Sequence, residues 1–241
     1  MDQTLHRLAE TFGIVTPMAR QRKLPPALRQ LHQHILRHFA LQATAPEPAR
    51  LREWAQQLDI ELGEGLNQLV SIDLVETDLA TAQLLGAYPF SAIPHGHKVQ
   101  LADGPTVEAY CAIDALGIPA MLNRDVVISS RDPQTGQLIR ITVTNGQASW
   151  RAAEAVVLLG SGPRCGPSAC QSCPYITFHS SLATAAAHLQ AADLAGEILT
   201  QPQALAAGAL LFSDLLRPIG EPVTGTSESS GPTTDHRRVA G

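Results

Sequence analysis

Apolar residues recur at helical spacing in the first third of the chain, before short alternating patterns take over. Between residues 27 and 40 they lie every three or four positions and predict an amphipathic helix, at Leu28, Leu31, Ile35 and Phe39. After "ATAPEP", the segments "ARLREWAQQLDI" and "GEGLNQLVSIDLVET" predict two short helices and a strand. This order is typical of a winged-helix-like unit. Its expected core is Leu51, Trp54, Leu58, Leu62, Leu66 and Leu69.

From residue 87 onward, the chain reads as short strands divided by turn residues. The turn Asp103–Gly104 and the following Pro105 predict the start of a helix over about Thr106 to Leu116. The alternating segments "DVVISSRD" and "QLIRITVTNG", joined by "DPQTG", predict a β-hairpin. "EAVVLLG" predicts a further strand, and "CPYITFHSS" a strand that runs into a helix capped near Ser180 or Ser181.

These patterns predict an α+β protein. We expect an N-terminal winged-helix-like helical domain over residues 1–86. A second domain over 87–217 is expected to have a core of short, mainly antiparallel β-strands with flanking helices. Residues 218–241 are rich in Pro, Gly, Ser and Thr and almost free of large apolar residues, which predicts a disordered tail.

Charge and composition narrow the function classes. The net charge of −5 gives no overall attraction to nucleic acid or to an anionic membrane. The candidate recognition helix, Gly63 to Val70, contains no Lys or Arg for phosphate contacts. No apolar run is long enough to span a bilayer, and the N-terminus lacks the order of a signal peptide. We therefore expect a cytoplasmic protein that binds neither nucleic acid nor membrane, with its four cysteines as thiols rather than disulfides.

Cys111 and Asp114 stand three positions apart in the apolar segment "EAYCAIDALGIPA". On a helix the two side chains share one face. A buried carboxyl can retain its proton, and a thiolate is a strong ligand for soft metals. The plainer alternative is a small buried Cys beside an Asp that hydrogen-bonds to the backbone, and the spacing alone favours it.

The other three cysteines, Cys165, Cys170 and Cys173, lie within nine residues as C-x4-C-x2-C. This spacing resembles a zinc knuckle that needs a fourth ligand, or part of a plant-type [2Fe–2S] pattern with Cys111 as the fourth Cys. A Gly- and Pro-rich loop with incidental thiols is the alternative. His95 and His97 form an H-x-H pair, which is common in surface turns, and are left out of the site.

Taken together, these segments resemble the alkylmercury (organomercurial) lyase family from about Ile93 to Leu189. "YCAIDALGIPAML" looks like the family's Trp-Cys-Ala-Leu-Asp segment, and "VVISSRDPQTGQLIRITVT" like the hairpin after it. "EAVVLLG" and "CPYITFHSS" look like the next strand and the strand that carries the second essential cysteine. By motif, Cys111, Asp114 and Cys173 match the family's catalytic residues.

The resemblance implies that residues 87–217 form a catalytic domain that cleaves carbon–mercury bonds of organomercurials by protonolysis. Two thiolates, Cys111 and Cys173, would bind mercury while Asp114 transfers the proton, giving a hydrocarbon and Hg(II) held by these three residues. No cofactor is implied beyond free thiols that remove the product. Hg(II) would pass to a mercuric reductase or to cellular thiols.

The sequence departs from the family pattern at several positions. Pro174 stands where a further cysteine often follows the second catalytic one, and Asp132 stands near the place of a structural cysteine in the hairpin. Cys165 and Cys170 are additional, and are candidates for further metal ligands. They keep open an alternative function: a non-catalytic, thiol-based metal-binding or metal-sensing protein on the same scaffold.

Overall fold

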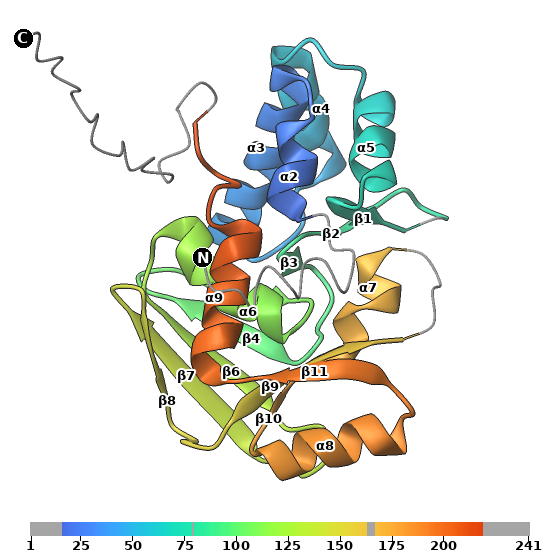
Figure 1. Ribbon diagram of the computed structural model, residues 1–241. Coiled ribbons are helices and arrows are strands. Elements are labelled where there is room, and N and C mark those ends of the chain that lie inside the picture. The colour runs from blue at the N-terminus through green and yellow to red at the C-terminus, as the bar shows by residue number, and fades with distance from the viewer. Residues whose placement is uncertain (1–15, 79, 163–166, 219–241) are drawn as a thin grey trace, which may run out of the picture.

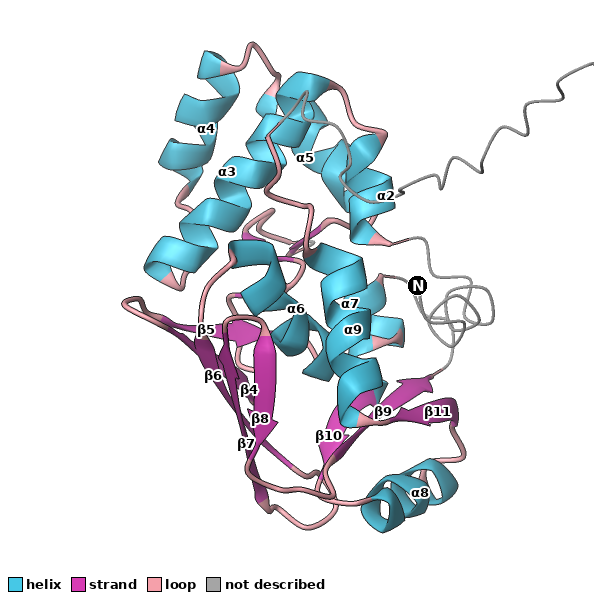
Figure 2. Ribbon diagram, turned by 60° about the vertical axis from the view of Figure 1, so that its left-hand side comes forward, coloured by secondary structure: helices cyan, strands magenta, loops and turns pink. Residues whose placement is uncertain are grey.

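The computed structural model describes residues 16–78, 80–162 and 167–218 (Figure 1). Helices α2–α5 lie at one end of the molecule, the long strands at the other, and α6 and α9 between them (Figures 1 and 2). The predicted tail falls outside the described residues apart from residue 218. The expected division of the chain at residue 86 stays a prediction.

The N-terminal helices follow the predicted hydrophobic pattern. Three of them begin at a proline, whose fixed φ suits the first helical turn. The predicted helix over 27–40 is α3, and the expected helix, helix, strand order is α4, α5 and β1. Of the expected core, Leu51 and Leu69 are buried and the other four side chains are partly buried against them. The helices are α2 (Pro17–Arg22), α3 (Pro26–Gln42), α4 (Pro48–Gln57) and α5 (Leu62–Ser71).

Eight antiparallel strands form the larger sheet, in the order β1-β2-β3-β5-β4-β6-β7-β8. The predicted hairpin is β6–β7, which pairs Val126 with Val143 and Arg131 with Leu138. Its buried positions alternate, as a sheet with one face on the core requires. The strands are β1 (Val75–Thr77), β2 (Leu84–Ala87), β3 (Phe90–Ser91), β4 (His97–Leu101), β5 (Thr106–Ala109), β6 (Val126–Arg131), β7 (Leu138–Thr144) and β8 (Gln147–Trp150).

A second, three-stranded antiparallel sheet has the order β10-β9-β11. The two predicted strands are its β9 and β10, and the helix after β10 has Ser181 as N-cap with a capping box to Thr184. The sequence patterns did not predict β11 and α9. The elements are β9 (Val156–Ser161), α7 (Ser168–Gln171), the 3-10 turn η1 (Cys173–Tyr175), β10 (Ile176–His179), α8 (Leu182–Ala191), β11 (Ala195–Leu199) and α9 (Gln201–Phe212).

The helix expected over Thr106 to Leu116 starts later than predicted. Residues 106–109 form strand β5, and helix α6 spans Ala112–Leu122. The turn at Asp103–Gly104 closes the β4–β5 hairpin instead of opening a helix, because Leu101 N–H donates to Pro105 C=O. Val107 and Ala109 are buried at period two, which is a strand pattern. Cys111 therefore precedes α6 as its N-cap and is not part of the helix.

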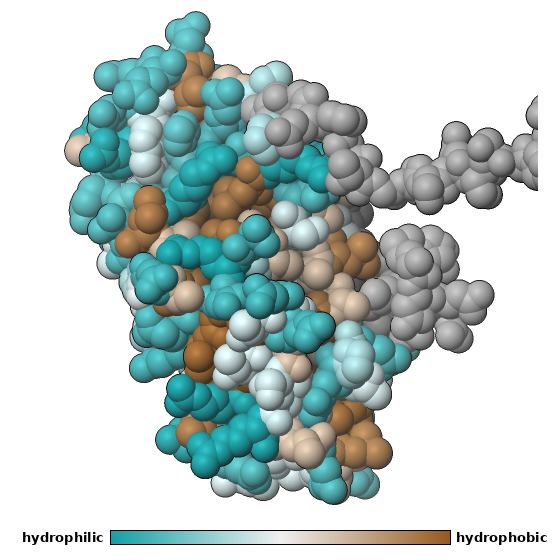
Figure 3. Space-filling view, turned by 90° about the vertical axis from the view of Figure 1, so that its left-hand side faces the viewer, coloured by the Kyte–Doolittle hydropathy of each residue, from teal (hydrophilic) through white to brown (hydrophobic). Residues whose placement is uncertain are grey.

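Helix α6 is buried nearly all round, against strands of both sheets and against α9. Glycines let the two helices approach: a Cβ at Gly117 would lie 2.3 Å from Phe212, and one at Gly208 would lie 2.7 Å from the Gly117 nitrogen. On the face seen in Figure 3, hydrophilic residues predominate and apolar ones reach the surface in separate groups. The α+β class and antiparallel strands with flanking helices are confirmed.

Candidate active site

Cys111 lies where β5 turns into α6. Its backbone is extended (φ −149°), and its Sγ accepts a hydrogen bond of 3.4 Å from the Asp114 N–H. The thiol thus occupies the capping place usually taken by a Ser, Thr or Asp side chain. Asp114 is in the first turn of the same helix. The positive end of the helix dipole favours negative charge on either group.

Cys173 reaches the same place from the other sheet. It is the first residue of η1, directly before β10, and β10 packs against α6. Pro174 is the second residue of this 3-10 turn, where the fixed φ of proline is compatible with the backbone. The Cys173 Sγ–H points to Asp114 Oδ2 at 3.8 Å. Residues 59 positions apart in the sequence are thus brought into contact.

The sulfurs of Cys111 and Cys173 and a carboxylate oxygen of Asp114 all lie within 4.8 Å of one another. The three residues are only 2%, 6% and 5% exposed, respectively. Among the described residues they form the one group of three or more potential His, Cys, Asp or Glu ligands at metal-binding distances. Two soft sulfurs and one oxygen in a buried, mainly apolar environment suit a soft metal ion.

Burial and the hydrogen bonds among the three side chains set the protonation of this group. Burial raises the pKa of Asp114 to about 7, although hydrogen bonds with the two thiols oppose the rise. Burial also raises the pKa of Cys111. The pKa of Cys173 lies well above the usual thiol value, through its hydrogen bond with Cys111 and its burial. Both sulfurs therefore keep their protons at neutral pH, and Asp114 can gain or lose one there.

The other cysteines do not join this group. Cys170 is exposed on α7 and is disulfide-bonded, so the expectation of four free thiols is wrong for this residue. A disulfide sulfur has no thiolate to offer a metal. Cys111 and Cys173 are free, as expected. Cys165 lies outside the described residues.

Asp132 is buried in the turn that connects β6 and β7. Its carboxylate accepts hydrogen bonds from Gln134 N at 2.8 Å, from Ser180 N at 2.8 Å and from Ser180 Oγ at 2.7 Å. It links the hairpin to the residues that open α8, and its oxygen lies 3.6 Å from the Nδ1 of buried His179. These contacts are structural, in keeping with the role expected for a residue at this place.

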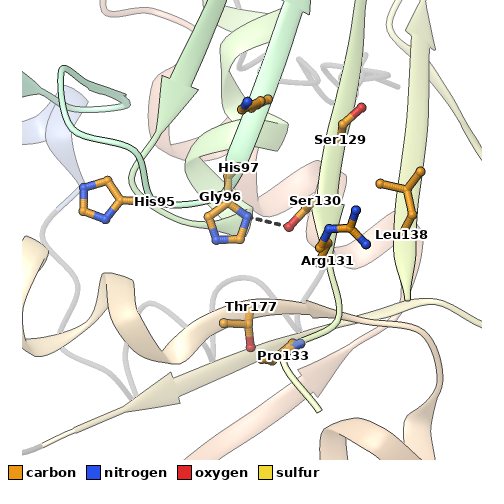
Figure 4. A pocket seen from close by; sticks show the side chains of 10 residues that line it. His95, Gly96, His97, Ser129, Ser130, Arg131, Pro133, Leu138 and Thr177 are labelled. Atoms are coloured by element: carbon orange, nitrogen blue, oxygen red, sulfur yellow. Dashed lines mark hydrogen bonds between the residues drawn. The ribbon is translucent and has the colours of Figure 1, made fainter. Parts of the chain in front are cut away.

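His95 and His97 line a separate cavity of about 450 Å³ between β4, β6 and β10 (Figure 4). His97 Nδ1 is 2.9 Å from Ser130 Oγ. Burial lowers the pKa of His97 to about 4, which leaves its imidazole neutral at pH 7. Cys111, Asp114 and Cys173 do not line this cavity.

Sequence reasoning missed the long-range contacts that frame the site from the N-terminal side. Tyr110 Oη donates to Glu76 Oε2 at 2.6 Å, and the Tyr110 ring contacts the Tyr88 ring with centroids 4.7 Å apart. Tyr88 Oη accepts from the Ala169 N–H at 2.8 Å. These partners lie tens of positions apart, so no local pattern could have paired them.

Comparisons with known proteins agree with this geometry. A sequence model of the alkylmercury lyase family, MerB, matches residues 90–213, from β3 to the end of α9. The chain belongs to the alkylmercury lyase family. All three residues of the buried group fall within the matched region of this alkylmercury lyase family member.

Individual relatives in the alkylmercury lyase family are distant. The alkylmercury lyase of Staphylococcus epidermidis is 34% identical over 83 residues, which are 34% of this chain and 36% of that protein. The chain thus aligns with about a third of the length of this curated relative. The crystal structure of the mercury-bound form of MerB2 matches with a TM-score of 0.67 at 25% identity, over 83% of this chain and 96% of that one. The architecture is therefore shared over nearly the whole of that structure.

Among the described residues, no helix combines the length and apolar character needed to cross a membrane.

Proposed function

We propose that this protein cleaves the carbon–mercury bond of organomercurials by protonolysis, giving a hydrocarbon and Hg(II). The observation that carries the proposal is the buried group of two free thiols and one carboxyl within 4.8 Å. Family membership supports the reaction class, and the mercury-bound form of the similar MerB2 structure supports mercury as the metal.

The two sulfurs recognise the substrate. An organomercurial R–Hg–X presents a soft Hg(II), which prefers thiolate to oxygen ligands. Cys111 at the helix N-terminus binds mercury, displaces X and gives up its thiol proton. Cys173 binds next, and its proton passes to Asp114 Oδ2, which lies 3.8 Å from its sulfur. Each added thiolate donates electron density to mercury and hence to the bonded carbon.

Asp114 completes the reaction by donating its proton to that carbon. The carbon–mercury bond breaks, its electron pair forms the new C–H bond, and RH leaves. In total, R–Hg–X and two thiols give RH, HX and Hg(II) bound to two thiolates. A carboxyl with a pKa of about 7 can serve first as proton acceptor and then as donor near neutral pH. Its position beside both sulfurs supplies proximity.

No organic cofactor has a role in this scheme. The product is Hg(II) on Cys111 and Cys173 with Asp114 beside it, and free thiols remove it by ligand exchange. We propose that cellular thiols or a mercuric reductase accept the ion.

Release of benzene from phenylmercury, or of methane from methylmercury, tests the proposal when excess thiol is present. Cys111→Ser and Cys173→Ser should each lower turnover by about 10³-fold or more, because a hydroxyl is a poor ligand and a poor nucleophile at neutral pH. Cys170→Ser is the matched control and should keep most of the turnover. A folded wild-type protein that releases no hydrocarbon would overturn the proposal. Stoichiometric metal bound without turnover would favour the metal-binding alternative.

A further inference from the structure

The segment that carries Cys173 is docked onto the N-terminal helical region through one carboxylate. Ser168, the first residue of α7, donates from its backbone N–H to Asp73 Oδ1 at 3.1 Å and from its hydroxyl to Asp73 Oδ2. The next residue donates its N–H to Tyr88 Oη at 2.8 Å. Cys173 follows Ser168 by only five positions, so the place of Ser168 limits where its sulfur can lie.

Asp73 is itself held from α2. Arg20 Nη1 donates to Asp73 Oδ2 at 2.7 Å and to the Asp73 carbonyl at 3.0 Å. The two side chains are 23% and 19% exposed, so this ion pair is less screened than one on the open surface. Asp73 also lies just beyond the end of α5. Its φ is +56°, and its N–H donates to Val70 C=O in the last turn of that helix.

Helix α7 has little stability of its own. It contains four residues, and no side chain caps it. A single isolated turn is unstable in water, because nucleation fixes several residues for one hydrogen bond. Contacts from outside must therefore hold it: beside the disulfide of Cys170 and the packing of Ala169 on the core, its first two residues bond to Asp73 and Tyr88.

We propose that Asp73, fixed by Arg20, is a positioning residue that holds the α7–η1 segment so that the Cys173 sulfur stays beside Cys111 and Asp114. Its effect on turnover rests on the proposed function, whereas its effect on the place of the sulfur does not. The N-terminal helical region would then help to position a residue of the site. This is a role for those helices that does not involve DNA.

The sharpest variant is Asp73→Gly. Glycine suits the backbone at φ +56°, so the end of α5 is retained while the carboxylate is lost. Arg22→Ala is the matched control: it lies on the same helix as Arg20 and loses an ion pair of 2.9 Å with Asp214 that does not reach α7. Arg20→Ala keeps the carboxylate and removes its anchor, and should fall between the two.

The first readout is the rate of alkylation of each cysteine by iodoacetamide, followed by mass spectrometry. In Asp73→Gly, Cys173 should react about tenfold faster than in the wild type, while Cys111 changes much less, because release of one segment exposes one sulfur. General destabilisation would speed both together. Turnover of phenylmercury should fall about 10- to 100-fold, mainly in kcat, since a displaced sulfur no longer meets mercury bound at Cys111.

Alkylation needs no turnover, so the two proposals fail separately. If the wild type releases no hydrocarbon, the function is wrong and the alkylation ratio still decides the role of Asp73. If Cys173 in Asp73→Gly reacts no faster than in Arg22→Ala, the positioning role is overturned. Should Asp73→Gly not fold, Ser168→Ala removes only the hydroxyl contact. It should raise Cys173 alkylation about two- to threefold, and an unchanged rate would again overturn the proposal.

Discussion

Asp114 and Asp132 are both buried, at 5% and 1% exposure, yet their surroundings are opposite. Asp132 accepts short hydrogen bonds from backbone and hydroxyl donors of its own turn and of Ser180. Burial alone would raise the pKa of Asp132, but these bonds outweigh it and hold the pKa well below its usual range. Asp114 has the two thiols and the Cys111 backbone to oppose burial, and its pKa still rises to about 7.

The difference shows that the donors around a buried carboxyl, rather than burial itself, decide its charge. Asp132 has four N–H or O–H donors and remains a permanent anion that ties two elements together. Asp114 has a pKa at which it can exchange a proton near neutral pH. One residue type thus serves as a structural link in the hairpin turn and, in the proposed reaction, as a proton carrier at the start of α6.

Of the changes at these two aspartates, the largest effect is expected for Asp114→Asn. The amide is close in shape but cannot carry the proton, so turnover of phenylmercury should fall by about 10²–10⁴-fold. Binding of Hg(II) by the two sulfurs should persist, and equilibrium dialysis of the variant measures it. Turnover within tenfold of the wild type would show that the proton comes from elsewhere.

Asp132→Ala should act on stability instead. Loss of the buried carboxylate leaves partly buried N–H and O–H donors unpaired, which should lower the free energy of unfolding by about 2–4 kcal/mol. Denaturant titration measures this, and Asp132→Asn, which retains an acceptor oxygen, should lose less. Below the unfolding transition, the folded fraction of Asp132→Ala should turn over substrate normally. A variant as stable as the wild type would contradict the structural role.

Stability should depend on pH with opposite signs at the two residues. The raised pKa of Asp114 means that its contribution is complete below the unfolded pKa near 4 and is lost as pH rises through about 7. Between pH 5 and pH 8, the wild type should lose about 2–3 kcal/mol of unfolding free energy relative to Asp114→Asn. The contribution of Asp132, whose pKa is depressed, is complete above pH 4 and lost in acid. Parallel pH profiles of wild type and Asp114→Asn would contradict the assignment.

Local patterns predicted much of this fold from the sequence. Apolar residues recur every three or four positions in α3 and at every second position in β6 and β7. Each spacing fits only one kind of secondary structure. The error at Thr106–Leu116 arose because a turn followed by proline opens helices and also closes hairpins. Only pairing with β4, a tertiary contact, decides between them. After Gln203, the sequence of α9 is entirely apolar or Gly, so it shows no helical alternation of apolar and polar residues.

The site was predictable only in part. Cys111, Asp114 and Cys173 were identified through resemblance, since spacing alone favoured an ordinary buried pair. The sequence did not show which residues hold the segment that carries Cys173. Asp73 lies 95 positions from Ser168, and nothing near either residue indicates the contact. Cys170 looked equivalent to Cys173 in spacing, but the strand and helix that follow Cys173 set it apart in the resemblance. The exposed, disulfide-bonded position of Cys170 agrees with that choice.

The close contact of Gly117 with Gly208 restricts how this enzyme family member can evolve. Any side chain at either glycine would push α9 away from the helix that carries Asp114, so neutral drift is closed on that side of α6. Under the proposed function, variation in the organic groups that are accepted must then come from other residues near the three-residue group, such as Tyr110 and the turn at Cys173. Libraries for directed evolution should therefore leave the α6–α9 crossing untouched and diversify those residues.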